Sequence, residues 1–513
     1  MKRTSLKRTM LPALTLYIVS CAGMALAAVE RPNILFIYTD DQSHRTVSCY
    51  PEAYDFAQTP HIDQLAENGI RFTHAYIGTW CMPSRAALLT GHHPYGVQSM
   101  RMVGEYPGST YDPRQCPFWP AVFRQHGYTT AQIGKWHTGT DTGFGRDWDY
   151  QVVWNRPRHV QNAGNYFYDQ LIETNGGKAV KTDGYSTDNY TQLAVDYIRG
   201  EHRDEKKPWY LWLCYGAVHG PFTPADRHLE TYPDVKIPLP EDIYPPRPGK
   251  PAYMQKIEYW VKGADGEPEM KGGAFGGKTV SGSKGIHGNS LHDWVRQYHQ
   301  GVKGIDDGVG RLIATLKETG QLENTLVVFT SDQGFGWGQH GFCRKIAPYD
   351  GTLRSPMIIS RPGTIPAGEV CSSPVGGVDL VPTFFQSAGL ELPWKMHGHD
   401  LSPLLKNPQA DWKHPVLLTF TGRNYGSDTD QVPPDSASLD AGGVPWWVFL
   451  VKGQYKYIRS LVKDEMEELY DLENDPEELN NLALEASQSR RLKKFRIALI
   501  AELKRTEAGM VKT

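Results

Sequence analysis

The sequence is poor in cysteine and has almost no charge imbalance. Its 513 residues include seven cysteines, and their spacings match no zinc-binding motif. Lysine and arginine together number 54 against 57 acidic residues, so the net charge is only −3 and no basic tract suited to nucleic acid is present. No internal repeat is visible. With ordinary apolar content, these absences leave a large globular chain whose affinity for any anion must be local.

Only the N-terminus carries a long apolar run. Four basic residues precede an apolar stretch from Met10 to Ala27. This order is typical of a secretory signal peptide, so we expect residues 1–27 to be removed and the protein to be periplasmic or secreted. A second possibility stays open, because Ile18-Val19-Ser20-Cys21 resembles a bacterial lipoprotein cleavage site and would attach the protein to a membrane through Cys21. A spanning anchor is disfavoured, since Pro12 interrupts a short apolar core.

Short apolar segments alternate with helical patterns along most of the chain. The clearest are Asn33–Thr39, Tyr210–Tyr215, Thr325–Thr330 and Pro356–Ser360. Strands that alternate with helices predict an α/β fold with helices on both faces of one sheet. In such sheets ligands collect at the carboxyl ends of the strands, which directs attention to the polar residues there.

Two regions differ from this pattern. Residues 240–292 are rich in proline, glycine and charge without periodicity, and predict a long loop insertion. Such a loop is either an excursion or a lid that shapes a site. Residues 409–513 contain two short strand patterns and a helical pattern from Ser487 to Arg505, which predict a small C-terminal α+β subdomain. Residues 28–408 would form the main N-terminal domain.

The most specific motif is Cys81-Met82-Pro83-Ser84-Arg85, followed by Leu-Thr-Gly at 89–91. A proline near the first turn predicts that a loop enters a helix here. The segment resembles the signature of formylglycine-dependent sulfatases, in which a maturing enzyme oxidises the cysteine to formylglycine (3-oxoalanine). Taken alone, the same residues also fit a buried cysteine at the start of a helix.

A second motif, Gly127 to His137, is similar to the second sulfatase signature. Lys135 and His137 lie two positions apart beside a glycine, and cationic donors placed in this way suit a tetrahedral anion. By themselves they would be a surface lysine and a structural histidine. With both signatures in order, the chain is identified as a member of the sulfatase family. The resemblance implies the alkaline-phosphatase-like fold, a large mixed, mostly parallel sheet sandwiched by helices.

Polar residues close two of the predicted strands, with two aspartates after the first strand and Asp-Gln after Ser331. Oxygen ligands specify calcium or magnesium over zinc, and adjacent carboxylates without a cation would repel one another. Each aspartate alone also fits a helix cap or turn. The resemblance implies one calcium ion bound by an oxygen of the modified Cys81 and by Asp40, Asp41, Asp332 and Gln333. Many relatives have Asn or His where Gln333 stands.

The family chemistry implies the roles of the remaining site residues. The hydrated aldehyde at position 81 attacks sulfur, His219 or Lys345 protonates the leaving alcohol, and His137 takes the proton that accompanies sulfate release. Lys345 alone would also fit a surface lysine, and relatives usually have proline where Val218 precedes His219. The catalytic residues implied are Cys81, Arg85, Lys135, His137, His219 and Lys345.

The expected substrate is a sulfated poly- or oligosaccharide, because export and abundant aromatic residues suit sugars. Algal galactans or ulvan and animal glycosaminoglycans are both open, and we favour the algal case although no residue decides it. The loop after the second signature is predicted to contact the sugar through Trp154, Asn155, Arg156, Arg158 and His159. A surface loop with a buried tryptophan explains these residues equally well.

Two other functions stay open. One is a phosphonate or phosphate ester hydrolase of the same superfamily, and the other is a non-catalytic carbohydrate-binding protein whose Cys81 remains a thiol. If Cys21 is cleaved off and Cys81 is modified, an odd number of thiols remains, so we expect no full disulfide framework.

Overall fold

The computed structural model describes residues 31–98, 100–103, 108–272, 288–433 and 443–511. The predicted signal peptide and Cys21 lie outside this part of the chain, as do residues 273–287 of the predicted insertion. No helix within the described part is long and apolar enough to cross a membrane. All six cysteines in it are unpaired.

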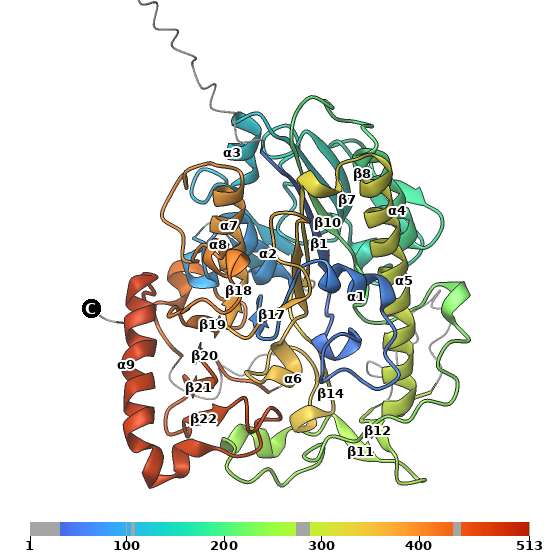
Figure 1. Cartoon of the computed structure of the whole chain (residues 1–513). Coiled ribbons are helices and arrows are strands. Elements are labelled where there is room, and N and C mark those ends of the chain that lie inside the picture. Colours follow the sequence, from blue (N-terminus) through green and yellow to red (C-terminus); the bar gives the residue numbers. More distant parts are fainter. Residues whose placement is uncertain (1–30, 99, 104–107, 273–287, 434–442, 512–513) are drawn as a thin grey trace, which may run out of the picture. The chain divides into compact units, whose positions relative to one another are not determined.

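A ten-stranded sheet lies at the centre of the described fold (Figure 1). Five neighbouring strands run parallel, in the order β13 (Thr325–Ser331), β1 (Asn33–Thr39), β10 (Trp209–Cys214), β6 (Thr129–Trp136) and β7 (Tyr150–Asn155). Antiparallel strands flank this set, β16 (Met357–Ser360) on one side and β8 (Gln170–Thr174) on the other. The outer strands are β2 (Ile70–Phe72), β17 (Glu369–Cys371) and β9 (Val180–Thr182). The predicted mixed, mostly parallel sheet is confirmed.

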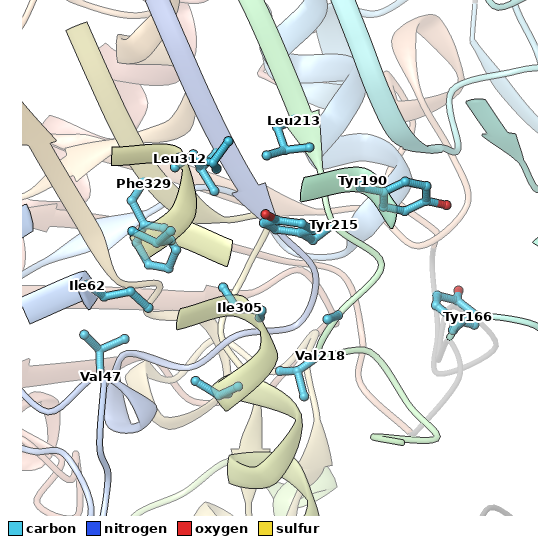
Figure 2. Packing of buried hydrophobic residues seen from close by; sticks show 14 of the residues in the cluster. Val47, Ile62, Tyr166, Tyr190, Leu213, Tyr215, Val218, Ile305, Leu312 and Phe329 are labelled. Atoms are coloured by element: carbon cyan, nitrogen blue, oxygen red, sulfur yellow. The ribbon is translucent and has the colours of Figure 1, made fainter. Parts of the chain in front are cut away.

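Helices cover both faces of the sheet (Figure 1). Alternate residues of β1 divide between two apolar cores, with Leu35 and Ile37 in one and Ile34 and Phe36 in the other. Both faces of the sheet are covered by apolar cores, so the central strands carry apolar residues on both sides. The first core is shared with α1 (Pro60–Glu67), α4 (Ser186–Ile198) and α5 (Leu291–Glu318), and Figure 2 shows part of it. The second is shared with α2 (Cys81–Thr90), α3 (Pro120–Gln125), α7 (Leu380–Ser387) and α8 (Ser402–Lys406).

The segment predicted as a long loop insertion contains short elements of its own. It contains a 3-10 helix, Ala252–Lys256, and the strand pair β11 (Trp260–Lys262) and β12 (Pro268–Met270), and α5 already begins at Leu291. Arg247 is buried and donates hydrogen bonds to the carbonyls of Asp242, Ile243, Met254 and Ile257. The Arg247 side chain thus donates to four backbone carbonyls of a segment that has little regular structure. The periodicity of the sequence does not reveal such contacts.

The C-terminal part is an antiparallel sheet with one long helix. The strands β19 (Val416–Phe420), β20 (Trp447–Lys452), β21 (Tyr455–Ser460) and β22 (Glu468–Asp471) pair in sequence order. One face of this sheet packs on α9 (Ser489–Arg505), and the other shares a core with Tyr253, Phe342 and Tyr349. The predicted α+β subdomain is therefore seen, and its predicted start at residue 409 lies between α8 and β19.

Buried ion pairs connect the C-terminal sheet to the segment that follows Lys345. Lys456 of β21 is fully buried, and its Nζ lies 2.9 Å from Asp350 Oδ1 and 2.9 Å from Glu478 Oε1. Asp350 begins α6 (Asp350–Leu353), a few residues after Lys345. The ion pairs therefore fix the segment that carries Lys345 to the C-terminal sheet.

Replacing Lys456 by methionine is expected to lower the free energy of unfolding by about 3–5 kcal/mol, because two buried carboxylates would lose their shared cation. Denaturant or thermal unfolding measures the change. Lys413→Met is the matched control, since Lys413 pairs with Asp411 on the surface with 77% of its side chain exposed. Equal, small losses for the two variants would contradict a structural role for this network.

Candidate active site

Parallel pairing of β1 with β13 brings the predicted metal ligands together. Thr39 stands opposite Ser331, so the residues that follow the two strands meet at one edge of the sheet. The backbone N–H of Asp41 donates to Oδ1 of Asp332 at 3.0 Å. Carboxylate oxygens of Asp40, Asp41 and Asp332 all lie within 4.8 Å of one another. We call these three residues the acidic cluster.

Cys81 is the first residue of α2 and is buried beside this cluster. Pro83 occupies the first turn, and Gly91 ends the helix with a φ of 74°, a conformation that glycine adopts without strain. The Sγ atom of Cys81 lies 3.5 Å from Nζ of Lys345. Burial raises the pKa of the Cys81 thiol, and the charges of Lys135 and Lys345 do not offset the increase. An unmodified thiol here would therefore be a weak nucleophile.

Three cations surround the acidic cluster, of which Lys135 and Arg85 are buried and Lys345 is partly buried. Lys135, at the end of β6, pairs with Asp40. Lys345 Nζ lies 2.6 and 2.8 Å from the two carboxylate oxygens of Asp41. Arg85, one turn along α2 from Cys81, places Nη2 3.4 Å from Asp332 Oδ2 and Nη1 3.2 Å from the carbonyl of Lys135. The sequence predicted these cations, and the fold brings all three to the same edge.

The pKa values in the acidic cluster diverge. Burial alone would raise the pKa of Asp40, but the charges of Lys135, His219, Arg85 and Lys345 together hold it well below the usual range. For Asp332 burial dominates and the charge of Asp40 adds to it, so the pKa is raised well above the usual range. Burial likewise raises the pKa of Asp41 against the opposing charge of Lys345. The cations therefore do not fully compensate three carboxylates.

The donor atoms fit a hard divalent cation. Oδ1 of Asp40 is buried and has no hydrogen-bond partner among the described residues. Gln333 donates its amide N–H to Asp41, while its carbonyl oxygen accepts from Ser84 at 3.4 Å. A half turn of the amide would bring an oxygen to the Asp41 side, so the departure from Asn or His leaves an oxygen ligand within reach. An oxygen-only set is what calcium and magnesium prefer.

Two histidines complete the group. Neither ring nitrogen of His137 has a hydrogen-bond partner within the described structure, although the residue is buried. Burial, and then the charges of Arg156 and Lys135, lowers its pKa well below the usual range, so the ring is neutral and able to accept a proton. Nδ1 of His219 donates to the carbonyl of Gly220 at 2.8 Å, and its Nε2 lies 3.6 Å from Asp41 Oδ2. Burial and the charge of Lys345 also lower the pKa of His219.

The residues of the predicted sugar-contacting loop lie in different surroundings in the structure. The guanidinium of Arg156 lies 5.5 Å from the ring centre of Tyr166 and is close enough to lower the pKa of His137. Arg158 and His159 turn instead to the buried Glu173, at 3.4 and 2.5 Å. Trp154 and Asn155 have no exposed surface, which corrects the prediction that they contact a sugar. Both end β7, so their side chains are held in the sheet layers.

Tyr166 is the site residue that sequence reasoning missed. Its ring stacks on the ring of His219, with centroids 4.1 Å apart and planes within 5° of parallel. Nζ of Lys135 lies 5.1 Å from the centre of the same ring. Tyr166 belongs to neither signature, and the sequence signal is only a short aromatic run at 166–168.

Arg85→Lys is expected to lower kcat by about 10- to 100-fold, because a point charge cannot reach Asp332 and the Lys135 carbonyl together as the forked guanidinium does. Steady-state kinetics at saturating substrate measures the loss. Arg203→Lys serves as control, since Arg203 donates to the carbonyls of Tyr197 and Ile198 away from the site. Wild-type turnover by Arg85→Lys would show that the forked geometry is not needed.

A mixed sheet with a buried cysteine, an acidic cluster and cations at its carboxyl edge defines a hydrolase of the alkaline-phosphatase-like superfamily. The family model for sulfatases matches residues 32–390, and the chain belongs to that family. It is a sulfatase, a hydrolase of sulfate esters.

Individual relatives agree with this assignment. An N-acetylglucosamine-6-O-sulfatase from Bacteroides thetaiotaomicron is 30% identical over 95% of this chain and 88% of its own length. A protein solved in complex with its substrate D-glucosamine-2-N,6-O-disulfate has a TM-score of 0.77 and 25% identity, over 93% of this chain and 98% of that one. The phosphonate monoester hydrolase of Agrobacterium radiobacter, with a TM-score of 0.67 and 22% identity over 93% of this chain and 96% of that one, shares the fold.

Proposed function

We propose that this sulfatase releases inorganic sulfate from a sulfated sugar, with a 6-O-sulfated glucosamine as the favoured unit. The observation that carries the proposal is the convergence of Cys81, the acidic cluster and three cations at one sheet edge. Support for the sugar comes from the relatives, two of which carry glucosamine sulfates in their descriptions. The preference for an algal polysaccharide stays a prediction.

We infer that Cys81 is converted to formylglycine by a maturing enzyme, and that one calcium ion is held by the acidic cluster and Gln333. The modification would supply a hydrated aldehyde as nucleophile, and the ion would supply charge that polarises the sulfate. The raised pKa of the Cys81 thiol supports the first inference, because catalysis by the thiol itself would require the opposite shift. The partnerless Oδ1 of Asp40 supports the second.

Residues of the chain itself supply the charge stabilisation and the proton transfers. Lys135 and Lys345 place positive charge where negative charge develops on the sulfate oxygens. His137, neutral because burial lowers its pKa, accepts the proton when sulfate is expelled. His219 and Lys345 are the two groups that face the leaving oxygen, and one of them donates its proton as the S–O bond breaks. A bound sulfate anion raises the pKa of His219 again, so its neutral resting state does not exclude this role.

Arg156 is the sugar-contacting candidate that the fold supports best. It lies beside Tyr166 and His137, whereas Arg158 and His159 are bound to Glu173. We propose that Arg156 contacts the sugar directly and that the other two act by shaping the loop.

The test is sulfate release from a panel of sulfated sugars, with protein produced alongside a maturing enzyme and assayed with calcium. The panel contains N-acetylglucosamine 6-sulfate, glucosamine 2-N,6-O-disulfate and sulfated galactose oligosaccharides. Release from 6-O-sulfated glucosamines is expected. Hydrolysis of phosphate or phosphonate monoesters assayed in parallel, with no sulfate release from the panel, would favour the related ester hydrolases. An unmodified Cys81 despite a competent maturing enzyme would favour a non-catalytic binding protein.

We propose that the protein is exported, on the strength of the pattern at Met1–Ala27. The N-terminus of the mature protein tests this directly. A start at Ala28 indicates a soluble periplasmic or secreted protein, and a lipid-modified Cys21 indicates a membrane-attached lipoprotein.

A further inference from the structure

We propose that Tyr166 is a positioning residue that holds the ring of His219 in the orientation the reaction needs. This inference rests on the proposed function and adds a residue to it. Tyr166 has 2% of its surface exposed and lies on the segment that precedes β8. In Figure 2 its labelled side chain lies at the margin of the packed core side chains.

Tyr166 is itself held by residues outside the reacting group. The ring of Trp154 meets it edge-on, with centroids 4.5 Å apart. Its backbone carbonyl accepts hydrogen bonds from Gln170 at 2.9 Å and from Ser186 at 2.8 Å. The Tyr166 ring is therefore a fixed surface, and what stacks on it takes its orientation.

His219 needs such a surface. It follows β10 on irregular backbone, and 21% of its side chain is exposed. Its Nδ1 bond to the carbonyl of Gly220 sets the tautomer, because a carbonyl only accepts, but one bond to the next residue does not fix the plane of the ring. The parallel stack on Tyr166 supplies the missing constraint.

The stacking geometry leaves Nε2 of His219 available. The Tyr166 hydroxyl lies 3.4 Å from Nε2, but the two rings are parallel, so the hydroxyl lies above the imidazole plane. The Nε2 lone pair lies within the imidazole plane and so does not point at the stacked hydroxyl, and Asp41 Oδ2 lies 3.6 Å from the same nitrogen. The aromatic face of Tyr166, and not its hydroxyl, therefore positions the ring of His219.

The same ring also faces the cations of the site. Lys135 and Arg156 lie 5.1 and 5.5 Å from its centre. An aromatic face attracts positive charge at such distances, whereas an aliphatic side chain does not. A phenylalanine at position 166 keeps this property, and a leucine loses it.

These contacts predict unequal effects of two substitutions. Tyr166→Phe is expected to keep kcat within about twofold of wild type, because it retains the stacked face. Tyr166→Leu is expected to lower kcat on a small aryl sulfate by about 10- to 100-fold with little change in KM, because His219 is displaced and this substrate lacks the sugar that Arg156 is proposed to contact. Tyr197→Leu is the control, since Tyr197 is a buried tyrosine bound to Thr129 at the opposite end of β6.

A double-mutant cycle separates positioning from general support. If Tyr166 acts through His219, adding Tyr166→Leu to His219→Ala should cost little further activity. Additive losses, or a Phe variant as damaged as the Leu variant, would overturn the proposal. The assays use a small aryl sulfate, so that an error about the sugar leaves the cycle measurable.

A crystal structure of Tyr166→Leu gives a readout that does not depend on turnover. The ring of His219 is expected to leave the orientation that it has in the wild type, parallel to the Tyr166 ring, and an unchanged ring would overturn the proposal. Absence of sulfate release by the wild-type enzyme would instead count against the proposed function alone.

Discussion

Cys81→Ala is expected to abolish sulfate release, with a loss of about 10⁴-fold or more in kcat. Cys81 begins α2 within reach of Lys345 and beside the acidic cluster, and no other described cysteine lies in that group. Removing the nucleophile from an otherwise intact site leaves binding and charge stabilisation, which account for only a small part of the rate. Sulfate release from an activated aryl sulfate, followed by ion chromatography, measures the loss over the widest range.

Cys371→Ala is the matched control, because Cys371 is another buried free thiol but lies on the edge strand β17. It should retain wild-type activity. Peptide mass spectrometry of the active protein should find formylglycine at position 81 and a thiol at position 371. Full activity in protein whose Cys81 is entirely unmodified would contradict the role of formylglycine while leaving Cys81 as the reacting residue.

Asp332→Asn is expected to remove the response of the protein to calcium and to lower kcat by at least about 100-fold. In the wild type, calcium binding to the folded state alone should raise Tm by roughly a few degrees. The substitution removes one charge from the set of oxygens that would hold the ion. Burial and the charge of Asp40 already raise the pKa of Asp332, so a neutral amide there should cost the calcium-free protein little stability.

Thermal unfolding with calcium and with a chelator tests this expectation without reference to turnover. Asp350→Asn is the control, because Asp350 is a buried carboxylate paired with Lys456 outside the site. It should lower Tm under both conditions and preserve the difference between them. A calcium-dependent rise in Tm that survives in Asp332→Asn would show that the ion binds elsewhere.

Sequence patterns predicted the strands that carry the site. The first strand was predicted at Asn33–Thr39 and β1 has the same bounds, while the predicted strand at 210–215 is displaced from β10 by one residue. Apolar runs of this length fix a buried strand wherever both faces are covered. The acids that follow β1 and β13 were expected at one edge of the sheet, because parallel strands end at the same edge.

Contacts between side chains that follow no periodic pattern were decided by the tertiary structure alone. Glu173 on β8 draws Arg158 and His159 away from the site, and Arg247 ties down a segment that has no periodicity. The ring of Tyr166 is held by an edge-on contact with Trp154, near the end of β7. Sequence determined the chemistry-bearing residues and the strands that end at them, because local patterns set both. Packing decided which side chains turn toward the reacting group, because that depends on neighbours that no local pattern specifies.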